Sequence, residues 1–266
     1  MPANESLEHQ TISAYLITKN EEKHIGAALA SVSWMDEIVV IDSESADKTV
    51  EIARKAGARV VNEPFRGFVE QKNLAMNMCK SDWVFNLDAD EEVTSALRQS
   101  ILEVLKNPKT GSEASIFTVT RKTWYMGRWI LHCGWYPEYR ERLSKRGAAR
   151  WEGEMLHEKL RGQEKIGRLA GDLLHRPYAD LGEHLEKMNL YTDLWARVEK
   201  NRGRKAHWTD ILFRPAASFI KMYVLRGGFL DYGPGLIASI MGAWYTFLKY
   251  ARLLELSRNS KIFRNY

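Results

Sequence analysis

An apolar run that ends in two aspartates constrains the fold of this chain more than any other feature. Four of the five residues from Trp83 to Leu87 suit a buried strand, and Asp88-Ala89-Asp90 follows directly. In an open α/β sheet, ligands bind outside the carboxyl ends of the strands. Two carboxylates at that place suit Mg²⁺ or Mn²⁺, which in turn suits a diphosphate. Because Asp-x-Asp also occurs in solvated turns, this interpretation depends on the surrounding chain.

The first hundred residues alternate between strand patterns and helix patterns. Asp47 is a good N-cap for a helix over 48–56, and Gly57 is a good stop. Alternation at this short spacing predicts a largely parallel sheet with right-handed crossovers. The sequence has neither a G-x-G-x-x-G fingerprint nor a P-loop, so a nucleotide would be held through strand-end carboxylates. The expected strands cover 12–17, 37–42, 58–61 and 83–87, and the expected helices cover 24–33, 48–56 and 71–79.

Length, cysteine content and charge narrow the class of protein. The 266 residues can form one large domain, or a domain with an appendage. Cys79 and Cys133 are the only cysteines, which argues against a disulfide framework or a structural zinc site and favours the cytosol. The N-terminus lacks the pattern of a secretory signal. From Lys200 onward there are twelve basic and three acidic residues, against 27 and 31 before it, so an anionic partner is expected at the tail.

Four short motifs between Thr18 and Glu91 have the order and spacing of a known family. They resemble family 2 glycosyltransferases with the GT-A fold, and most of all the bacterial lipopolysaccharide core beta-1,4-glucosyltransferases. The likeness continues through 151–158 and into the tail. It implies a GT-A domain, a UDP-sugar donor and a divalent cation, Mn²⁺ or Mg²⁺. The motifs are Thr18-Lys19-Asn20-Glu21-Glu22, Val39-Val40-Ile41-Asp42-Ser43, Gln71-Lys72-Asn73 and Leu87-Asp88-Ala89-Asp90-Glu91.

The resemblance implies a role for most of the polar residues in these motifs. Asp42 would hydrogen-bond the uracil, although an exposed loop aspartate is an equal alternative from the pattern alone. Lys72 would lie near the nucleotide or its phosphates, the alternative being a solvated helix face. Asp88 would contact the ribose or the metal, and Asp90 would bind the metal that bridges the diphosphate. Glu91 would support the turn. The residues that would border the uridine are Thr18, Asn20 and Glu21.

Sugar transfer from a nucleotide diphosphate also needs a base for the acceptor hydroxyl, and residues 151–160 provide candidates. For inverting displacement, the base must lie opposite the leaving group. The resemblance favours Glu158 as the base, Glu154 as the second choice and His157 as a third metal or phosphate contact. If the segment is one strand, Glu152, Glu154 and Glu158 share a face and His157 points to the other, unless the strand bends. The alternative is surface glutamates and a core histidine.

An aromatic and basic region occupies 121–129 and 135–140. Aromatic faces suit sugar rings and arginines suit phosphates, so this region fits a phosphorylated sugar acceptor. Ordinary packing in a core or interface is the alternative for its aromatic residues. Arg140 and Arg142 have the spacing of a strand with one polar face. The region also resembles a stacking surface for single-stranded nucleic acid, but the Asp-x-Asp context argues against a nucleic-acid partner.

The C-terminal part has the pattern of helices that lie on a membrane surface. The segment 179–202 is one amphipathic helix whose apolar stripe is expected to pack against the sheet. The segment 207–250 mixes apolar runs with basic residues, and its longest run, Pro234–Leu248, is shorter than the roughly 20 residues that span a bilayer. Such helices fit the interface of an anionic membrane. Homo-oligomerisation through the same face is the alternative.

Together these observations predict a GT-A α/β domain over 10–178, with a mainly parallel sheet flanked by helices. A helical, membrane-associating extension follows over 179–266. The expected activity is metal-dependent, inverting transfer of a hexose, as glucose from UDP-glucose, to an inner-core sugar of lipopolysaccharide. The enzyme would be cytoplasmic and peripheral on the inner face of the cell membrane, where a lipid-anchored saccharide acceptor lies. The alternatives are transfer to a polyprenyl phosphate carrier and a catalytically silent membrane-bound adaptor of the same fold.

Overall fold

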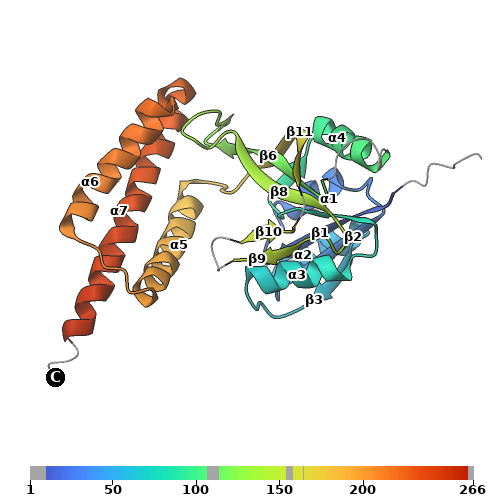
Figure 1. The fold of residues 1–266 in the computed structure, drawn as a ribbon, viewed down its shortest axis with the longest axis horizontal. Helices are drawn as coiled ribbons and strands as arrows, with labels where there is room; N and C mark the ends of the chain where they lie inside the picture. Colours follow the sequence, from blue (N-terminus) through green and yellow to red (C-terminus); the bar gives the residue numbers. More distant parts are fainter. Residues whose placement is uncertain (1–9, 107–113, 154–157, 164, 263–266) are drawn as a thin grey trace, which may run out of the picture. The chain divides into compact units, whose positions relative to one another are not determined.

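The computed structural model describes residues 10–106, 114–153, 158–163 and 165–262, which form two compact units. The first unit contains Met1–Arg121 and Tyr139–His175, and the second contains Lys122–Glu138 and Arg176–Tyr266. The strands are β1 Ile12–Thr18, β2 Glu37–Asp42, β3 Arg59–Asn62, β4 Trp83–Asn86, β5 Glu91–Val93, β6 Ile116–Tyr125, β7 Arg128–Trp129, β8 Glu138–Lys145, β9 Arg150–Glu152, β10 Lys159–Arg161 and β11 Ile166–His175 (Figure 1). The helices are α1 Ile25–Ser31, α2 Thr49–Lys55, α3 Phe68–Met78, α4 Ser95–Lys106, α5 Leu181–Asn201, α6 Trp208–Phe219, the π-helix η1 Ile220–Leu225, the 3₁₀ helix η2 Gly228–Asp231 and α7 Tyr232–Ile262.

In the described part of the chain, a nine-stranded sheet has the order β3-β2-β1-β4-β8-β6-β11-β5, with β7 paired to β6. Strands β1 to β4 pair with one another in parallel, as the alternating pattern predicts. Beyond them, β8 is antiparallel to β4 and β5 is antiparallel to β11. The sheet is therefore mixed, and the prediction of a mainly parallel sheet is wrong beyond β4. The physical reason is that no helix lies between β6 and β11 among the residues the structure describes, so these strands lack the crossovers that parallel pairing requires.

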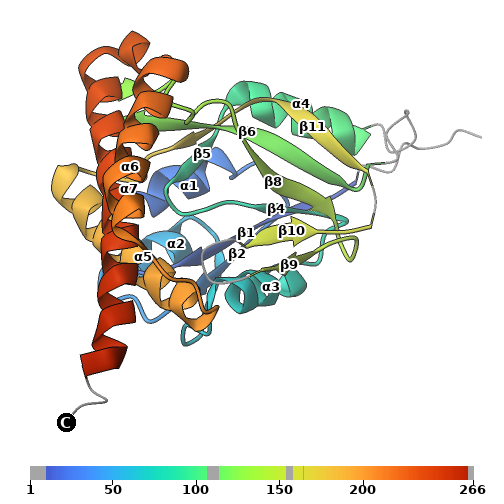
Figure 2. The same cartoon turned by 60° about the vertical axis from the view of Figure 1, so that its left-hand side comes forward.

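The residues of the parallel strands alternate between two apolar faces. Ala14, Leu16 and Val40 belong to a core that includes residues of α1, α2 and α4. Tyr15 and Val39 belong to a second core, which includes residues of α3, β9 and β10. The first unit therefore has helices on both faces of its sheet (Figures 1 and 2). Because both faces are covered, these strands are apolar throughout, which explains their continuous apolar runs.

The helix boundaries differ from the expected ones by a few residues. Helix α2 begins at Thr49, and Lys48 occupies the N-cap position that the sequence assigned to Asp47. The Asp47 carboxylate still accepts a hydrogen bond from the Thr49 backbone N–H at 3.0 Å. Helix α3 begins at Phe68, directly after Gly67, whose φ of 113° is unfavourable for other residues.

Residues 151–160 do not form one strand. Strands β9 and β10 are antiparallel arms of a small two-stranded sheet, with Glu152 opposite Lys159. Gly153 has a φ of 116° directly after β9, a conformation that only glycine adopts readily. The expectation of one strand with a shared face is therefore wrong, because Glu152 ends β9 and Glu158 precedes the antiparallel strand β10. Glu154 and His157 lie outside the described residues.

The second unit consists of β7, the surrounding loop and the C-terminal helices. The stripe on α5 that the sequence assigned to packing against the sheet packs on α7, where the rings of Trp195 and Tyr250 are 5.4 Å apart. Helix α6 packs along α7 as well. Within the described residues, no helix has both the length and the apolar character needed to cross a membrane. The assignment of 10–178 and 179–266 to separate domains stays a prediction.

Candidate active site

A buried arginine organises the turn that carries the two aspartates. Arg142 lies on β8, whose Leu143 is paired with Phe85 of β4, so its guanidinium reaches the carboxyl end of β4. It donates hydrogen bonds to Asp88 Oδ2 and to Glu91 Oε1, both at 2.6 Å, and to the Asn86 side-chain oxygen. Arg142 is 3% exposed. The sequence predicted that Arg142 lies on the polar face of a strand, but the structure buries its side chain inside the first unit.

Glu91 supports this turn, as the sequence predicts. Its Oε2 accepts the Asp88 backbone N–H at 3.1 Å, and Arg121 Nη1 lies 3.5 Å from its Oε1. Glu91 is fully buried. The Glu91 carboxylate therefore fixes the Asp88 backbone, while the Arg142 guanidinium holds the Asp88 side chain.

The Asp88 carboxyl is strongly acidic. Burial alone would raise its pKa, but the positive charges of Arg142 and Lys72 outweigh burial and hold the pKa far below the usual range. Asp88 is therefore ionised throughout the pH range in which proteins normally work. An ionised carboxylate is the form that can bind a cation.

Lys72 links Asp88 to the candidate base. Its Nζ lies 3.2 Å from Glu158 Oε1 and 3.5 Å from Asp88 Oδ1. The same ammonium lies 4.6 Å from the centre of the Trp151 ring. Lys72 is 5% exposed, so the alternative of a solvated helix face is wrong. One buried ammonium therefore connects two carboxylates that come from chain segments 70 residues apart.

Asp90 has a different neighbour from Asp88. Its Oδ2 lies 3.4 Å from His175 Nε2, at the end of β11. Pairing of His175 with Glu91 in the β5–β11 ladder brings this histidine to the aspartate turn. No sequence motif marks His175, so only the antiparallel register reveals it.

The chemistry of these residues fits a divalent cation. Asp88 and Asp90 offer hard oxygen donors, and Mg²⁺ is commonly bound by one or two carboxylates together with substrate phosphates. Across 10–106, 114–153, 158–163 and 165–262 there is no group of three or more His, Cys, Asp or Glu side chains arranged to hold a metal. A site formed by two carboxylates and a diphosphate agrees with both observations.

The loops after β1 and β2 are joined by side-chain hydrogen bonds. Asp42 is 1% exposed, and its two carboxylate oxygens accept the backbone N–H and the hydroxyl of Ser45 at 2.8 and 2.5 Å. The alternative of an exposed loop aspartate is therefore wrong. Asn20 accepts the Ala46 N–H at 2.8 Å, and the Glu21 N–H donates to the Thr49 hydroxyl at 2.8 Å. These bonds fix the two loops to each other at the carboxyl edge of the sheet.

Thr18 carries a buried hydroxyl at the same edge of the sheet. It is paired with Asp42 in the β1–β2 ladder and is 6% exposed. Its hydroxyl is buried and has no hydrogen-bond partner among the described residues. A buried hydroxyl without a partner is unfavourable, so a ligand that hydrogen-bonds it would gain binding energy.

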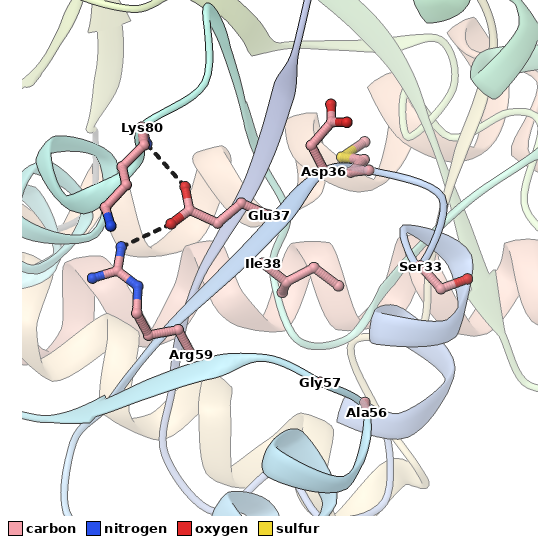
Figure 3. Close-up of a pocket in the computed structure, with 9 residues that line it drawn as sticks. Ser33, Asp36, Glu37, Ile38, Ala56, Gly57, Arg59 and Lys80 are labelled. Atoms are coloured by element: carbon pink, nitrogen blue, oxygen red, sulfur yellow. Dashed lines mark hydrogen bonds and ion pairs between the residues drawn. The ribbon is translucent and has the colours of Figure 1, made fainter.

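A pocket of about 320 Å³ lies at the opposite end of β2 (Figure 3). Glu37, the first residue of β2, accepts hydrogen bonds there from Arg59 at 3.0 Å and from the Lys80 backbone N–H at 2.9 Å. Burial would raise the pKa of Glu37, but these hydrogen bonds, with one from Ser13, lower it. Asp42 is the last residue of the same strand. The pocket therefore lies away from the carboxyl edge, and none of the predicted site residues lines it.

Comparisons with known proteins define the class. Residues 13–159 match the sequence profile of glycosyl transferase family 2, so the chain belongs to that family and is a glycosyltransferase with a GT-A-like α/β fold. It is 31% identical over 256 residues to the lipopolysaccharide core biosynthesis glycosyltransferase LpsC of Rhizobium meliloti (strain 1021), with 92% of each chain covered. It is 29% identical to an uncharacterized glycosyltransferase of Rickettsia typhi (strain ATCC VR-144 / Wilmington), over 94% of this chain and 89% of that protein. A solved structure, glucosyl-3-phosphoglycerate synthase of Mycobacterium tuberculosis, is 29% identical over 44% of this chain and 45% of that one, with a TM-score of 0.35.

Proposed function

We propose that this chain transfers glucose from UDP-glucose to an inner-core sugar of lipopolysaccharide, with inversion and with the help of a divalent cation. One observation carries the proposal: Lys72 lies within 3.5 Å of both Asp88 and Glu158. The predicted metal ligand and the predicted base thus approach the same buried ammonium. The similarity to a relative named as a lipopolysaccharide core glycosyltransferase supports the choice of acceptor.

The donor would be bound by residues at the carboxyl edge of β1, β2 and β4. In this proposal Thr18, Asn20 and Glu21 border the uridine, and Asp42 hydrogen-bonds the uracil. The unpartnered Thr18 hydroxyl beside Asp42 supports a polar ligand at this place. Asp88 and Asp90 would hold the divalent ion, which supplies Lewis-acid neutralisation of the leaving diphosphate without proton transfer. The Lys72 ammonium would add a second positive charge on the diphosphate side.

Glu158 would act on the acceptor side. Its carboxylate takes the proton of the acceptor hydroxyl while the hydroxyl oxygen forms a bond to the anomeric carbon of the donor sugar. The bond from that carbon to the diphosphate oxygen breaks, and UDP leaves with the bonding electrons. Because the attack comes from the face opposite UDP, the configuration inverts. Glu154 as second base and His157 as metal or phosphate contact stay predictions.

Transfer of labelled glucose tests this function directly. UDP-glucose is incubated with Mn²⁺ and either lipopolysaccharide of truncated core or polyprenyl phosphate, using wild type, Glu158→Gln and Glu152→Gln. Glu152 is the exposed control on the neighbouring hairpin arm. Label in the lipopolysaccharide, lost only in Glu158→Gln, supports the proposal. Label in polyprenyl phosphate instead would establish the other acceptor class, and transfer to neither would favour the silent adaptor.

We also propose that the second unit binds an anionic membrane surface. An "apolar row" of exposed residues runs along α6 and η1, and a second lies on α7 with spacings of four residues. Exposed large apolar patches mark interaction surfaces, and flanking cations favour anionic lipid. Nearby exposed basic residues are Lys205, Arg214, Lys221 and Arg226. The apolar row on α6 and η1 comprises Trp208, Leu212, Phe213, Ile220, Val224 and Leu225, and that on α7 comprises Tyr232, Leu236, Ile240 and Trp244.

Charge supports a membrane over a second copy of the chain as the occupant. Twelve basic residues against three acidic ones after residue 199 would make two copies of this surface repel each other. The same charge attracts phospholipid headgroups by about 1 kcal/mol for each basic residue near the surface. In this proposal the enzyme lies on the cytoplasmic face of the cell membrane, where a lipid-anchored saccharide acceptor is within reach.

A further inference from the structure

The hairpin that carries Glu158 is too small to hold its own position. Strands β9 and β10 have three residues each and pair only with each other in the described structure. An isolated two-stranded hairpin is marginally stable in water. Helix α3 lies beside β9 (Figures 1 and 2), so the contacts between these two elements decide where the hairpin sits in the first unit.

The side chain of Asn73 takes the place of a neighbouring strand for β9. Its Nδ2–H donates to the Trp151 carbonyl at 2.9 Å, and its Oδ1 accepts the Trp151 N–H at 2.9 Å. Both backbone groups of one edge-strand residue are thereby satisfied by a single amide. This two-bond contact defines the position of β9 along α3 as well as its distance from it.

Trp151 is fixed at two further points. Its indole N–H donates to the Tyr15 hydroxyl at 2.8 Å, and the Lys72 ammonium lies over its ring at 4.6 Å. The residue is 3% exposed. Trp151 is therefore held by α3, by β1 and by the lysine that bridges the two carboxylates.

These contacts lead from Asn73 to the reacting groups. Lys72 and Asn73 are successive residues of α3, and Glu158 directly precedes the arm that pairs with β9. We infer that Asn73, through Trp151, is a positioning residue that sets the place of Glu158 relative to Lys72 and Asp88. The inference rests on the proposed function, since it gives the hairpin the task of presenting the base.

Loss of this anchor should affect transfer more than donor binding. A displacement of about 1 Å at a reacting group can reduce the rate by about 100-fold. The proposed uridine contacts lie at the ends of β1 and β2 and in the loop after β1, which the hairpin does not form. In Asn73→Ala we expect kcat to fall by about 10- to 100-fold, while the Kd of UDP with Mn²⁺ stays within about threefold of wild type.

The experiment compares Asn73→Ala with Asn77→Ala. Asn77 is exposed on the same helix, one turn further along, so its substitution matches the change in helix composition without touching the hairpin. Glucose transfer from UDP-glucose to truncated lipopolysaccharide gives kcat, calorimetry gives the Kd of UDP, and amide exchange of residues 150–152 reports the anchor. The inference is supported if Asn73→Ala, but not Asn77→Ala, shows faster amide exchange at 150–152 and a lower kcat with an unchanged Kd of UDP. Equal behaviour of the two variants, or a loss of UDP binding that parallels the loss of kcat, overturns it.

A second variant keeps the inference testable if Asn73→Ala does not fold. Tyr15→Phe removes only the hydroxyl that accepts the Trp151 indole N–H and leaves α3 unchanged. It should lower kcat in the same direction as Asn73→Ala with UDP affinity retained, and an unaltered kcat would contradict the inference. Failure of the proposed function would be recognised separately, because wild type itself would then transfer no glucose. In that case the amide exchange at 150–152 still decides whether Asn73 anchors the hairpin.

Discussion

Arg142 is a buried cation that serves three acceptors at the end of β4. Removing one partner of a buried ion pair leaves an uncompensated charge, which costs about 3–5 kcal/mol. Arg142→Met would remove the 2.6 Å contacts to the Asp88 and Glu91 carboxylates and leave the more distant contacts of Lys72 and Arg121 at 3.5 Å. We expect the free energy of unfolding in urea to fall by about 3–5 kcal/mol. Arg150→Met is the control, since this arginine side chain is 73% exposed, and it should change stability by less than about 0.5 kcal/mol. Equal effects of the two variants would mean that the buried network does not stabilise the turn.

Asp90 is expected to act on the cation and not on the fold. Its carboxylate side chain is partly exposed, and only its charge is removed in Asp90→Asn. Calorimetry should therefore show that Mn²⁺ no longer strengthens UDP binding by this variant, while its melting temperature stays near that of wild type. Glu92→Gln removes the same charge two residues further along and should behave like wild type. Metal-dependent UDP binding that survives in Asp90→Asn would exclude Asp90 as a ligand.

His184 makes the stability of the second unit depend on pH. It stacks on Tyr178 at 4.1 Å, its Nδ1 lies 2.9 Å from the Tyr125 hydroxyl, and burial followed by the charge of Lys187 lowers its pKa from 6.5 to about 4. Between these two values the unfolded chain binds the proton and the folded chain does not, so stability falls as the pH falls. The loss should reach about 2 kcal/mol at about pH 5 relative to neutral pH. Urea unfolding at both pH values should show that the free energy of unfolding changes less with pH in His184→Gln than in wild type. An unchanged pH dependence in the variant would mean that groups other than His184 cause it.

At the scale of the elements, the sequence predicts the parallel part of the sheet well. Apolar runs for β1, β2 and β4 are unambiguous because both faces of these strands are buried. The later strands are harder to predict, since β8 carries the polar run Arg140, Glu141 and Arg142 before its buried Leu143. Its buried arginine is matched by carboxylates on other elements, which a single sequence does not reveal.

The residues of the candidate site likewise differ in how far the sequence predicts them. The motifs alone point to Asp88, Asp90, Asp42 and Lys72, because each follows a strand end or belongs to a family motif. The positions of Arg142 and His175 depend on antiparallel pairing between strands distant in sequence. Glu158 could be named from its motif, but its 3.2 Å contact with Lys72 requires the tertiary structure. Sequence patterns thus identify chemical groups, and long-range pairing decides which groups meet.

The apolar row on α6 and η1 gives a prediction at the same scale. Phe213 is 64% exposed, and burying such a side chain in lipid contributes about 1.5–3 kcal/mol. Phe213→Glu should therefore weaken binding to vesicles that contain anionic lipid by about tenfold or more in a sedimentation assay. Leu190→Glu is the matched control, because Leu190 is 57% exposed on α5 and lies outside the apolar rows. If both substitutions weaken binding equally, added negative charge and not the apolar row would explain the effect.

On the scale of the whole molecule, charge is unevenly distributed along the chain, with 27 basic and 31 acidic residues before residue 200 and twelve basic and three acidic residues from there on. This distribution predicts that membrane binding raises the encounter rate with an embedded acceptor without changing the chemical step. Phe213→Glu should therefore transfer glucose more slowly to lipopolysaccharide in vesicles, yet keep the wild-type kcat on a deacylated core saccharide in solution. Raising the salt concentration should narrow the difference between wild type and variant on vesicles, because screening weakens the attraction of the basic tail to lipid. Equal losses on the embedded and the soluble acceptor would show that the helices of the second unit take part in forming the active site, and membrane recruitment would then not be their main contribution.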